Sequence, residues 1–153
     1  MSRSSETNLF ADYDHSHHPF LEAAQDFRYL LGKGYARPGA LMFVGNRYQL
    51  PKSEREILNR GVYPEAEART RRERLVTSDR LKGRTVGLDG HNVLITVESA
   101  LLGRELVACD DGLIRDTAGL SSSYRPSETT DRALDLILNY LERQKATSVL
   151  FFL

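Results

Sequence analysis

The stretch that decides the fold reads Thr85-Val86-Gly87-Leu88-Asp89-Gly90-His91-Asn92-Val93-Leu94-Ile95-Thr96. Its first apolar run ends at Asp89, a turn follows, and a second apolar run begins at Val93, which predicts a buried strand, a turn and a helix. In an open parallel sheet, ligands and metals bind beyond the carboxyl ends of the strands. Asp89 is therefore a candidate ligand. A role as the N-cap of the helix would also explain it, because aspartate is favoured at that position.

A second strand is predicted to end in acidic residues at the same edge of the sheet. Residues 93–103 are long enough for a helix, and residues 105–109 form a short apolar run that stops at Asp110 and Asp111. The order strand, helix, strand is typical of a right-handed crossover between parallel strands. We therefore expect Asp110 and Asp111 to face the same crevice as Asp89.

The C-terminal residues predict one further helix and one further strand. Residues 131–144 carry apolar side chains at helical spacing, and residues 147–153 are apolar and rich in β-branched and aromatic residues. Asp131 stands at the start of this helix, where it either interacts with the helix dipole or supplies a further carboxylate to the crevice. Because a buried parallel strand normally leads into another crossover, we expect the sheet to be incomplete at Leu153, as in a truncated chain.

The first half of the chain predicts a different architecture. Residues 1–18 are polar and lack periodicity, which is typical of a disordered arm. Apolar spacing and helix-end residues predict three short helices within positions 19–63, and hence a small helical bundle. Residues 64–84 are charge-rich and predict a solvated helix or a linker. Residues 85–153 then form a parallel-sheet α/β domain.

Some basic and aromatic residues of this half are candidates for contact with nucleic acid. Arginine next to an aromatic ring suits phosphate contact and base stacking, and this combination occurs within positions 35–38 and 45–48. The charge-rich segment contributes further arginines. The candidate residues are Arg37, Arg47, Tyr48, Arg71 and Arg72. The alternative is ordinary packing, with the aromatic rings inside the bundle and the arginines facing water.

Converging carboxylates at strand ends have a chemical rationale. Mg²⁺ and Mn²⁺ prefer hard oxygen ligands, and Mg²⁺ is usually held by one or two carboxylates with waters and substrate phosphates. Such ions activate water and stabilise the oxygens of a phosphodiester during cleavage, whereas carboxylates clustered without a cation repel one another. We therefore expect Mg²⁺ or Mn²⁺ at a site formed by Asp89, Asp110, Asp111 and Asp131, with Asn92 orienting a ligand or the turn.

Two resemblances bear on this interpretation. Residues 88–94 resemble the opening strand of PIN-like and NYN ribonuclease domains, which begin with an apolar strand and an Asp-Gly-x-Asn turn, and residues 130–133 resemble a later helix start in those nucleases. This resemblance implies a PIN-like, Rossmannoid α/β fold, with Asp89, Asn92 and Asp131 as site residues. From about Phe20 onward, the chain also resembles an uncharacterised prokaryotic family, domain of unknown function 434. The matching stretches are 45–50, 89–96 and 109–112.

Composition and charge narrow the class of protein. The 153 residues contain 21 Lys or Arg and 21 Asp or Glu, but residues 1–85 carry 15 basic and 11 acidic side chains, and residues 86–153 carry 6 and 10. This split suits either a basic surface that feeds an anionic substrate to an acidic pocket or two surfaces that pack together. The single cysteine, Cys109, is consistent with a reducing cytoplasm, and no apolar run is long enough to span a membrane.

Two functions of different classes follow from these patterns. The first is a metal-dependent nuclease that acts on RNA. The second is a non-catalytic module that binds nucleic acid or protein and uses the α/β unit as a scaffold. A phosphatase-like hydrolase would also place aspartates at strand ends, but no Asp-x-Asp pair follows a predicted strand.

Overall fold

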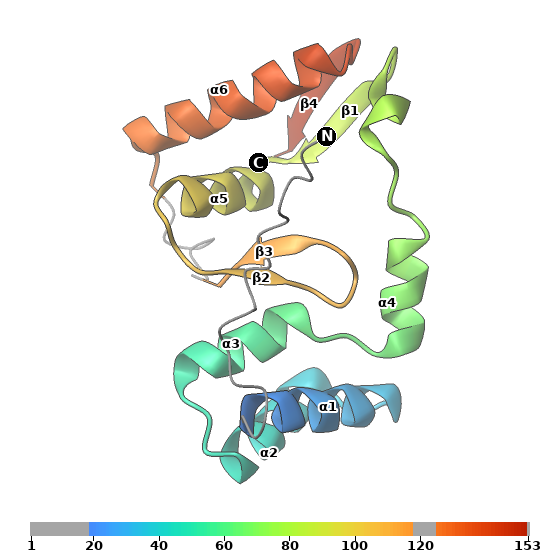
Figure 1. The fold of residues 1–153 in the computed structure, drawn as a ribbon, viewed down its shortest axis with the longest axis vertical. Coiled ribbons are helices and arrows are strands. Elements are labelled where there is room, and N and C mark those ends of the chain that lie inside the picture. The colour runs from blue at the N-terminus through green and yellow to red at the C-terminus, as the bar shows by residue number, and fades with distance from the viewer. Residues whose placement is uncertain (1–18, 118–124, 153) are drawn as a thin grey trace, which may run out of the picture.

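The computed structural model describes residues 19–117 and 125–152 and has mixed α/β architecture (Figure 1). The predicted disordered arm at residues 1–18 lies outside these ranges. The N-terminal part contains the three predicted helices, α1 (Pro19–Gly32), α2 (Arg37–Arg47) and α3 (Lys52–Gly61), followed by α4 (Glu65–Arg72) and a short 3-10 helix, η1 (Ser78–Leu81). The predicted bundle is therefore confirmed, and part of the charge-rich segment is helical.

Helices α1 to α3 enclose the first hydrophobic core. Its centre is formed by Phe27 of α1, Val44 of α2 and Leu58 of α3, whose side chains are fully buried. Gly45 on α2 allows the Arg55 guanidinium to cross the helix, because a Cβ at position 45 would lie 2.5 Å from Nη1 of that arginine. Arg55 donates to the carbonyl oxygens of Gly45 at 2.7 Å and Leu50 at 2.8 Å, and it thereby stabilises the end of α2.

The C-terminal part contains two of the three predicted parallel strands, together with the two predicted helices. Strand β1 (Thr85–Asp89) leads directly into α5 (Gly90–Leu101), and α6 (Glu128–Arg143) leads into β4 (Ser148–Phe152). The strands β1 and β4 are parallel neighbours, with Thr85 opposite Ser148 and Asp89 opposite Phe152. Helices α5 and α6 pack against each other and cover one face of this sheet, where Leu94, Ala133, Ile137 and Leu141 form the second core (Figure 1).

The prediction that residues 105–109 form a strand parallel to β1 is wrong. Strand β2 (Leu106–Ala108) pairs with β3 (Ile114–Asp116) in antiparallel register, as a sheet separate from β1 and β4. The reversal occurs at Asp110-Asp111-Gly112, where Gly112 adopts a φ of +82° and donates its N–H to the Cys109 carbonyl at 2.9 Å. A turn of this kind favours a hairpin, because glycine adopts positive φ without steric cost.

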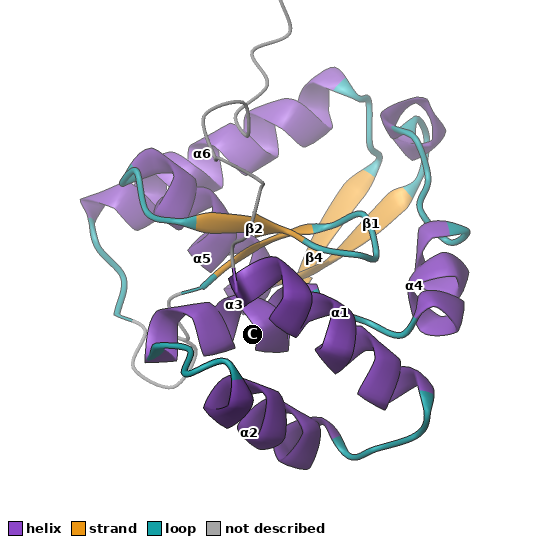
Figure 2. Cartoon of the chain, turned by 60° about the horizontal axis from the view of Figure 1, so that its bottom comes forward, coloured by secondary structure: helices purple, strands orange, loops and turns teal. Residues whose placement is uncertain are grey.

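The hairpin lies between the helical bundle and the C-terminal α/β layers. Strand β2 contacts α3, and β3 contacts α5 (Figures 1 and 2). The two aspartates of the hairpin turn are therefore brought to the bundle rather than to the carboxyl end of β1.

Candidate functional site

Asp89 ends β1 and caps the helix that follows. Its Oδ1 accepts a hydrogen bond from the backbone N–H of Asn92 at 3.3 Å, and its Oδ2 accepts one from Asn92 Nδ2 at 2.6 Å. The residue is exposed, and Phe152, its partner across the sheet, ends β4 at the same edge. The capping role is therefore confirmed. The Asp89 carboxylate also lies at the carboxyl edge of two adjacent parallel strands.

Asp110 fastens the hairpin turn to α1. Arg28 donates Nε to Oδ2 and Nη2 to Oδ1, both at 2.8 Å, in a bidentate ion pair. The backbone N–H of Tyr63 donates to Oδ2 at 3.0 Å, and the Asp110 N–H donates to the Gly61 carbonyl at 2.8 Å. Arg72 donates to the Asp110 carbonyl. Charge-assisted bidentate pairs are geometrically specific as well as strong, so this contact fixes the position of the turn.

Asp111 is fully buried and is neutralised by arginine. Arg115 donates Nη1 to Oδ1 at 2.8 Å and Nη2 to Oδ2 at 2.7 Å, and the Leu113 N–H donates to Oδ1 at 3.2 Å. Nη1 of Arg71 lies 3.7 Å from Oδ2. The hydrogen bonds from Arg115 hold the pKa of Asp111 below its ordinary value, and the carboxylate raises the pKa of Arg115. This carboxylate is therefore charged and already paired.

Three guanidinium groups surround the ring of Tyr63. Their Cζ atoms lie 4.7 Å (Arg71), 5.1 Å (Arg37) and 5.5 Å (Arg115) from the ring centroid. Arg37 also donates to two carbonyl oxygens near the end of α3, at 2.8 and 2.9 Å. Cation–π contacts of this kind stabilise a partly desolvated arginine. Arg37 and Arg71, both predicted to contact nucleic acid, thus have partners within the protein, although the side chain of Arg71 is 45% exposed.

The other predicted nucleic-acid residues also have partners within the protein. Arg72 pairs with Glu65 at 2.8 Å in addition to its bond with the hairpin. Tyr48 donates its hydroxyl to Asp26 Oδ2 at 2.8 Å, which raises the pKa of Tyr48, and Arg47 Nε lies 3.7 Å from the same oxygen. These contacts favour the packing alternative for this group of residues.

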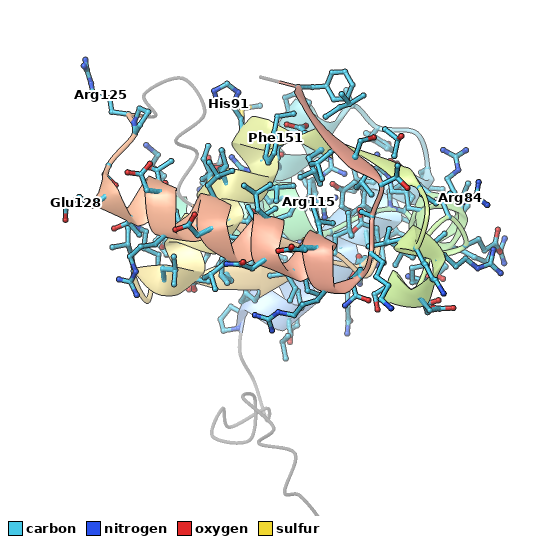
Figure 3. All side chains as sticks on the ribbon, turned by 90° about the horizontal axis from the view of Figure 1, so that it is seen from above. Arg84, His91, Arg115, Arg125, Glu128 and Phe151 are labelled. Atoms are coloured by element: carbon cyan, nitrogen blue, oxygen red, sulfur yellow. The ribbon has the colours of Figure 1, made fainter. Side chains whose placement is uncertain are left out.

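Asp131 lies in the first turn of α6, at a distance from the end of β1. The start of α6 is fixed by Glu98 of α5, whose buried Oε1 accepts hydrogen bonds from Ser127 Oγ at 3.0 Å and Thr130 Oγ1 at 2.8 Å. Glu98 is eight residues beyond Gly90, which corresponds to about 12 Å along the helix. Figure 3 shows Glu128 at one end of α6, well away from His91 at the start of α5.

The four predicted metal-binding aspartates therefore do not converge. Within residues 19–117 and 125–152, no group of three or more His, Cys, Asp or Glu side chains is placed to hold a metal ion. The physical reason is the hairpin, which pairs Asp110 and Asp111 with arginines. What remains at the edge of the parallel strands is the carboxylate of Asp89 and the amide of Asn92. These oxygens suit Mg²⁺ or Mn²⁺ where water and phosphate oxygens complete the coordination.

The sequence interpretation missed most partners of the acidic residues. Arg115 follows Asp111 by four positions, and an Asp-Gly turn between two apolar runs is a hairpin signal that would have indicated their proximity. Arg28 is 82 positions from Asp110, and Glu98 is 29 from Ser127, so no local pattern marks these pairs. Asp116 of β3 is buried, and Arg60 lies 3.6 Å from it.

Comparison with known proteins divides the chain into two matched segments. Residues 19–74 match a family described as "Protein of unknown function (DUF434)", and residues 78–153 match one described as "Domain of unknown function (DUF5616)". The resemblance to the first family is thus confirmed for the N-terminal part, whereas the C-terminal part matches a different family. The hairpin and its arginine partners join these two segments.

One relative is an uncharacterized protein of the archaeon Methanocaldococcus jannaschii. It is 34% identical over 130 residues, which cover 85% of this chain and 62% of the relative, so the chain spans less than two thirds of that protein's length. No solved structure matches the chain. Within the described ranges, no helix is both long and apolar enough to cross a membrane.

Proposed function

We propose that this protein is a metal-dependent nuclease acting on RNA, in which Asp89 is the metal-binding carboxylate. The observation that supports this proposal is the position of Asp89 at the shared carboxyl edge of β1 and β4, where it is exposed. Ligand sites of parallel sheets lie beyond this edge. A bound Mg²⁺ or Mn²⁺ would supply activation of a water and stabilisation of negative charge on the phosphate.

In this proposal Asn92 is the positioning residue for the carboxylate. Its two hydrogen bonds, from the backbone N–H and from Nδ2, engage both carboxylate oxygens and so restrict the rotation of the Asp89 side chain. The amide of Asn92 is left with its carbonyl oxygen as an acceptor for a metal-bound water or a ligand. Asp110 and Asp111 have no part in the reaction, because each is held by an arginine.

The test is Mn²⁺ binding by calorimetry, followed by cleavage of a labelled RNA in Mn²⁺. Asp89→Asn removes the charge and keeps an N-cap residue, so we expect the variant to fold. Asp135→Asn is the matched control, because Asp135 is exposed on α6 and its replacement by asparagine makes the same change in charge. We expect binding at micromolar to low-millimolar Mn²⁺ in the wild type and the control, and at least about tenfold weaker binding in Asp89→Asn, the loss of one charged ligand. Equal binding in all three proteins would refute the proposal.

A non-catalytic RNA-binding module is the second candidate. The observation that favours it is the pairing of Asp110 and Asp111 with arginines, which leaves a single predicted carboxylate at the strand edge. This function predicts that RNA binds equally well to the wild type and Asp89→Asn, and that the RNA stays intact in Mn²⁺.

A further inference from the structure

Five exposed basic residues gather at the amino ends of β1 and β4. They come from the segment before β1 and from the end of α6, and we call them the basic edge: Arg80, Lys82, Arg84, Arg143 and Lys145. Two backbone hydrogen bonds join these distant segments, from Gly83 N–H to the Lys145 carbonyl at 2.9 Å and from Thr147 N–H to the Arg84 carbonyl at 2.8 Å. Leu81 packs against the second core and anchors the first segment.

The side chains of the basic edge differ from the arginines around the hairpin in having no partners. In the part of the chain that the structure describes, none of the five forms an ion pair or a side-chain hydrogen bond, whereas Arg28 and Arg115 both hold aspartates. Acidic residues in residues 78–84 and 142–147 are limited to Asp79 and Glu142. Unpaired like charges on one surface create a positive potential, which attracts a polyanion.

The basic edge is continuous with the exposed face of the parallel sheet. On both strands the burial alternates, and the face away from α5 and α6 carries Leu150, 52% exposed, and Phe152, 63% exposed. The Phe152 ring lies over Gly87, where an added Cβ would approach the ring to 3.1 Å. The strand β1 spans about 13 Å from Thr85 to Asp89. An exposed aromatic ring at the far end of a basic surface suits the stacking of a base.

We propose that the basic edge binds the phosphodiester backbone of RNA, and that the RNA chain then crosses the open face of the sheet toward Phe152 and Asp89. This inference takes RNA as the ligand from the proposed function. It assigns the RNA contact to residues other than those expected from the sequence. It also explains why five cations occur together without acidic partners in a chain with no net charge.

The test measures the binding of a fluorescein-labelled RNA of 12 uridines. Fluorescence anisotropy reports the binding, in EDTA and at NaCl concentrations between 50 and 200 mM. The edge variant carries Arg80→Gln, Lys82→Gln, Arg84→Gln and Lys145→Gln. The control carries Lys52→Gln, Arg104→Gln, Arg125→Gln and Arg132→Gln, which removes the same charge from exposed positions elsewhere. Figure 3 shows Arg84 and Arg125 at opposite ends of α6.

We expect the edge variant to lose about 3 units of the slope of log Kd against log salt, because each phosphate contact to a single strand contributes about 0.7. Its affinity should fall by at least about tenfold at 100 mM NaCl, while the control stays within about twofold of the wild type. Equal losses in the two variants would overturn the assignment, since binding would then follow net charge. So would a wild type that binds no RNA at 50 mM NaCl, which would leave an acidic protein surface as the partner.

The failure of this inference and of the proposed function can be told apart. In EDTA no divalent ion is available, so RNA binding at the basic edge should be the same in Asp89→Asn and in the wild type. A loss of Mn²⁺ binding in Asp89→Asn bears on the nuclease proposal alone.

Discussion

Replacing Asp111 by Asn should destabilise the protein by about 3 kcal/mol, near the lower end of what breaking a buried ion pair costs. The carboxylate is fully buried and accepts two hydrogen bonds from Arg115, whose side chain is 22% exposed. The amide would keep one acceptor, but its NH₂ group would face a guanidinium donor, and the positive charge of Arg115 would be left uncompensated. The residual exposure of Arg115 limits the cost.

The sign of the change in stability distinguishes two roles of Asp111, as the ion-pair partner of Arg115 or as one carboxylate of a metal-binding cluster. In an acidic cluster without its cation, removing a charge relieves repulsion and stabilises the fold. Here the melting temperature should instead fall by about 9 °C, at roughly 3 °C per kcal/mol for a chain of this size. Thermal unfolding followed by circular dichroism measures it. Asp89→Asn is the matched control and should change stability by less than about 0.5 kcal/mol, because asparagine caps helices as well as aspartate.

A double variant tests whether the loss of stability comes from the ion pair between Asp111 and Arg115. Asp111→Asn combined with Arg115→Gln removes both charges, so it should cost less than the sum of the single changes, with a coupling of about 1–3 kcal/mol. Additive losses, or an Asp111→Asn variant as stable as the wild type, would refute the reasoning.

Two other predictions concern titratable groups of the hairpin. Because the folded-state pKa of Asp111 is lowered, its contribution to stability is complete above the ordinary value of 3.8 and is lost as the pH falls through the lower, folded value. Urea denaturation measures the difference in unfolding free energy between the wild type and Asp111→Asn. This difference should therefore be constant from pH 7 to 5 and shrink below pH 4. A constant difference down to pH 2.5 would contradict the lowered pKa. Burial raises the pKa of the Cys109 thiol, which is 8% exposed, so its reaction with an aromatic disulfide at pH 8 should be at least about tenfold slower in the native protein than in urea; equal rates would show that the thiol is accessible.

The sequence predicted the type of the helices α1, α2, α3, α5 and α6 and of the strands β1, β2 and β4. Apolar spacing in α1 and α6 and the apolar runs of β1 and β4 determine both element type and the buried face, since helices and strands bury residues at different periods. The three-residue strand β2 carries no such period. Its pairing depends on the turn at Gly112, and the wrong assignment to a crossover moved Asp110 and Asp111 to the wrong edge.

Side-chain partners could be predicted only where they are local. The cap formed by Asp89 and Asn92 spans three positions and follows from residue type at a helix start. Arg28 with Asp110, and Glu98 with Thr130, join elements that tertiary packing brings together, so a single sequence contains no signal for them. The pairing of Asp111 with Arg115, four positions away, could therefore have been predicted from the hairpin signal, whereas the pairing of Asp110 with Arg28 could not.

The network at the hairpin also explains much of the charge difference between the two halves of the chain. Arg28, Arg60 and Arg71 of the basic half lie against Asp110, Asp116 and Asp111 of the acidic half. Much of the asymmetry thus reflects two segments that pack together, the second of the two interpretations of the charge split. The charges that this packing leaves unpaired are the informative ones. They include the basic edge at one end of the parallel strands and Asp89 at the other, and a ligand that is both anionic and extended would contact both.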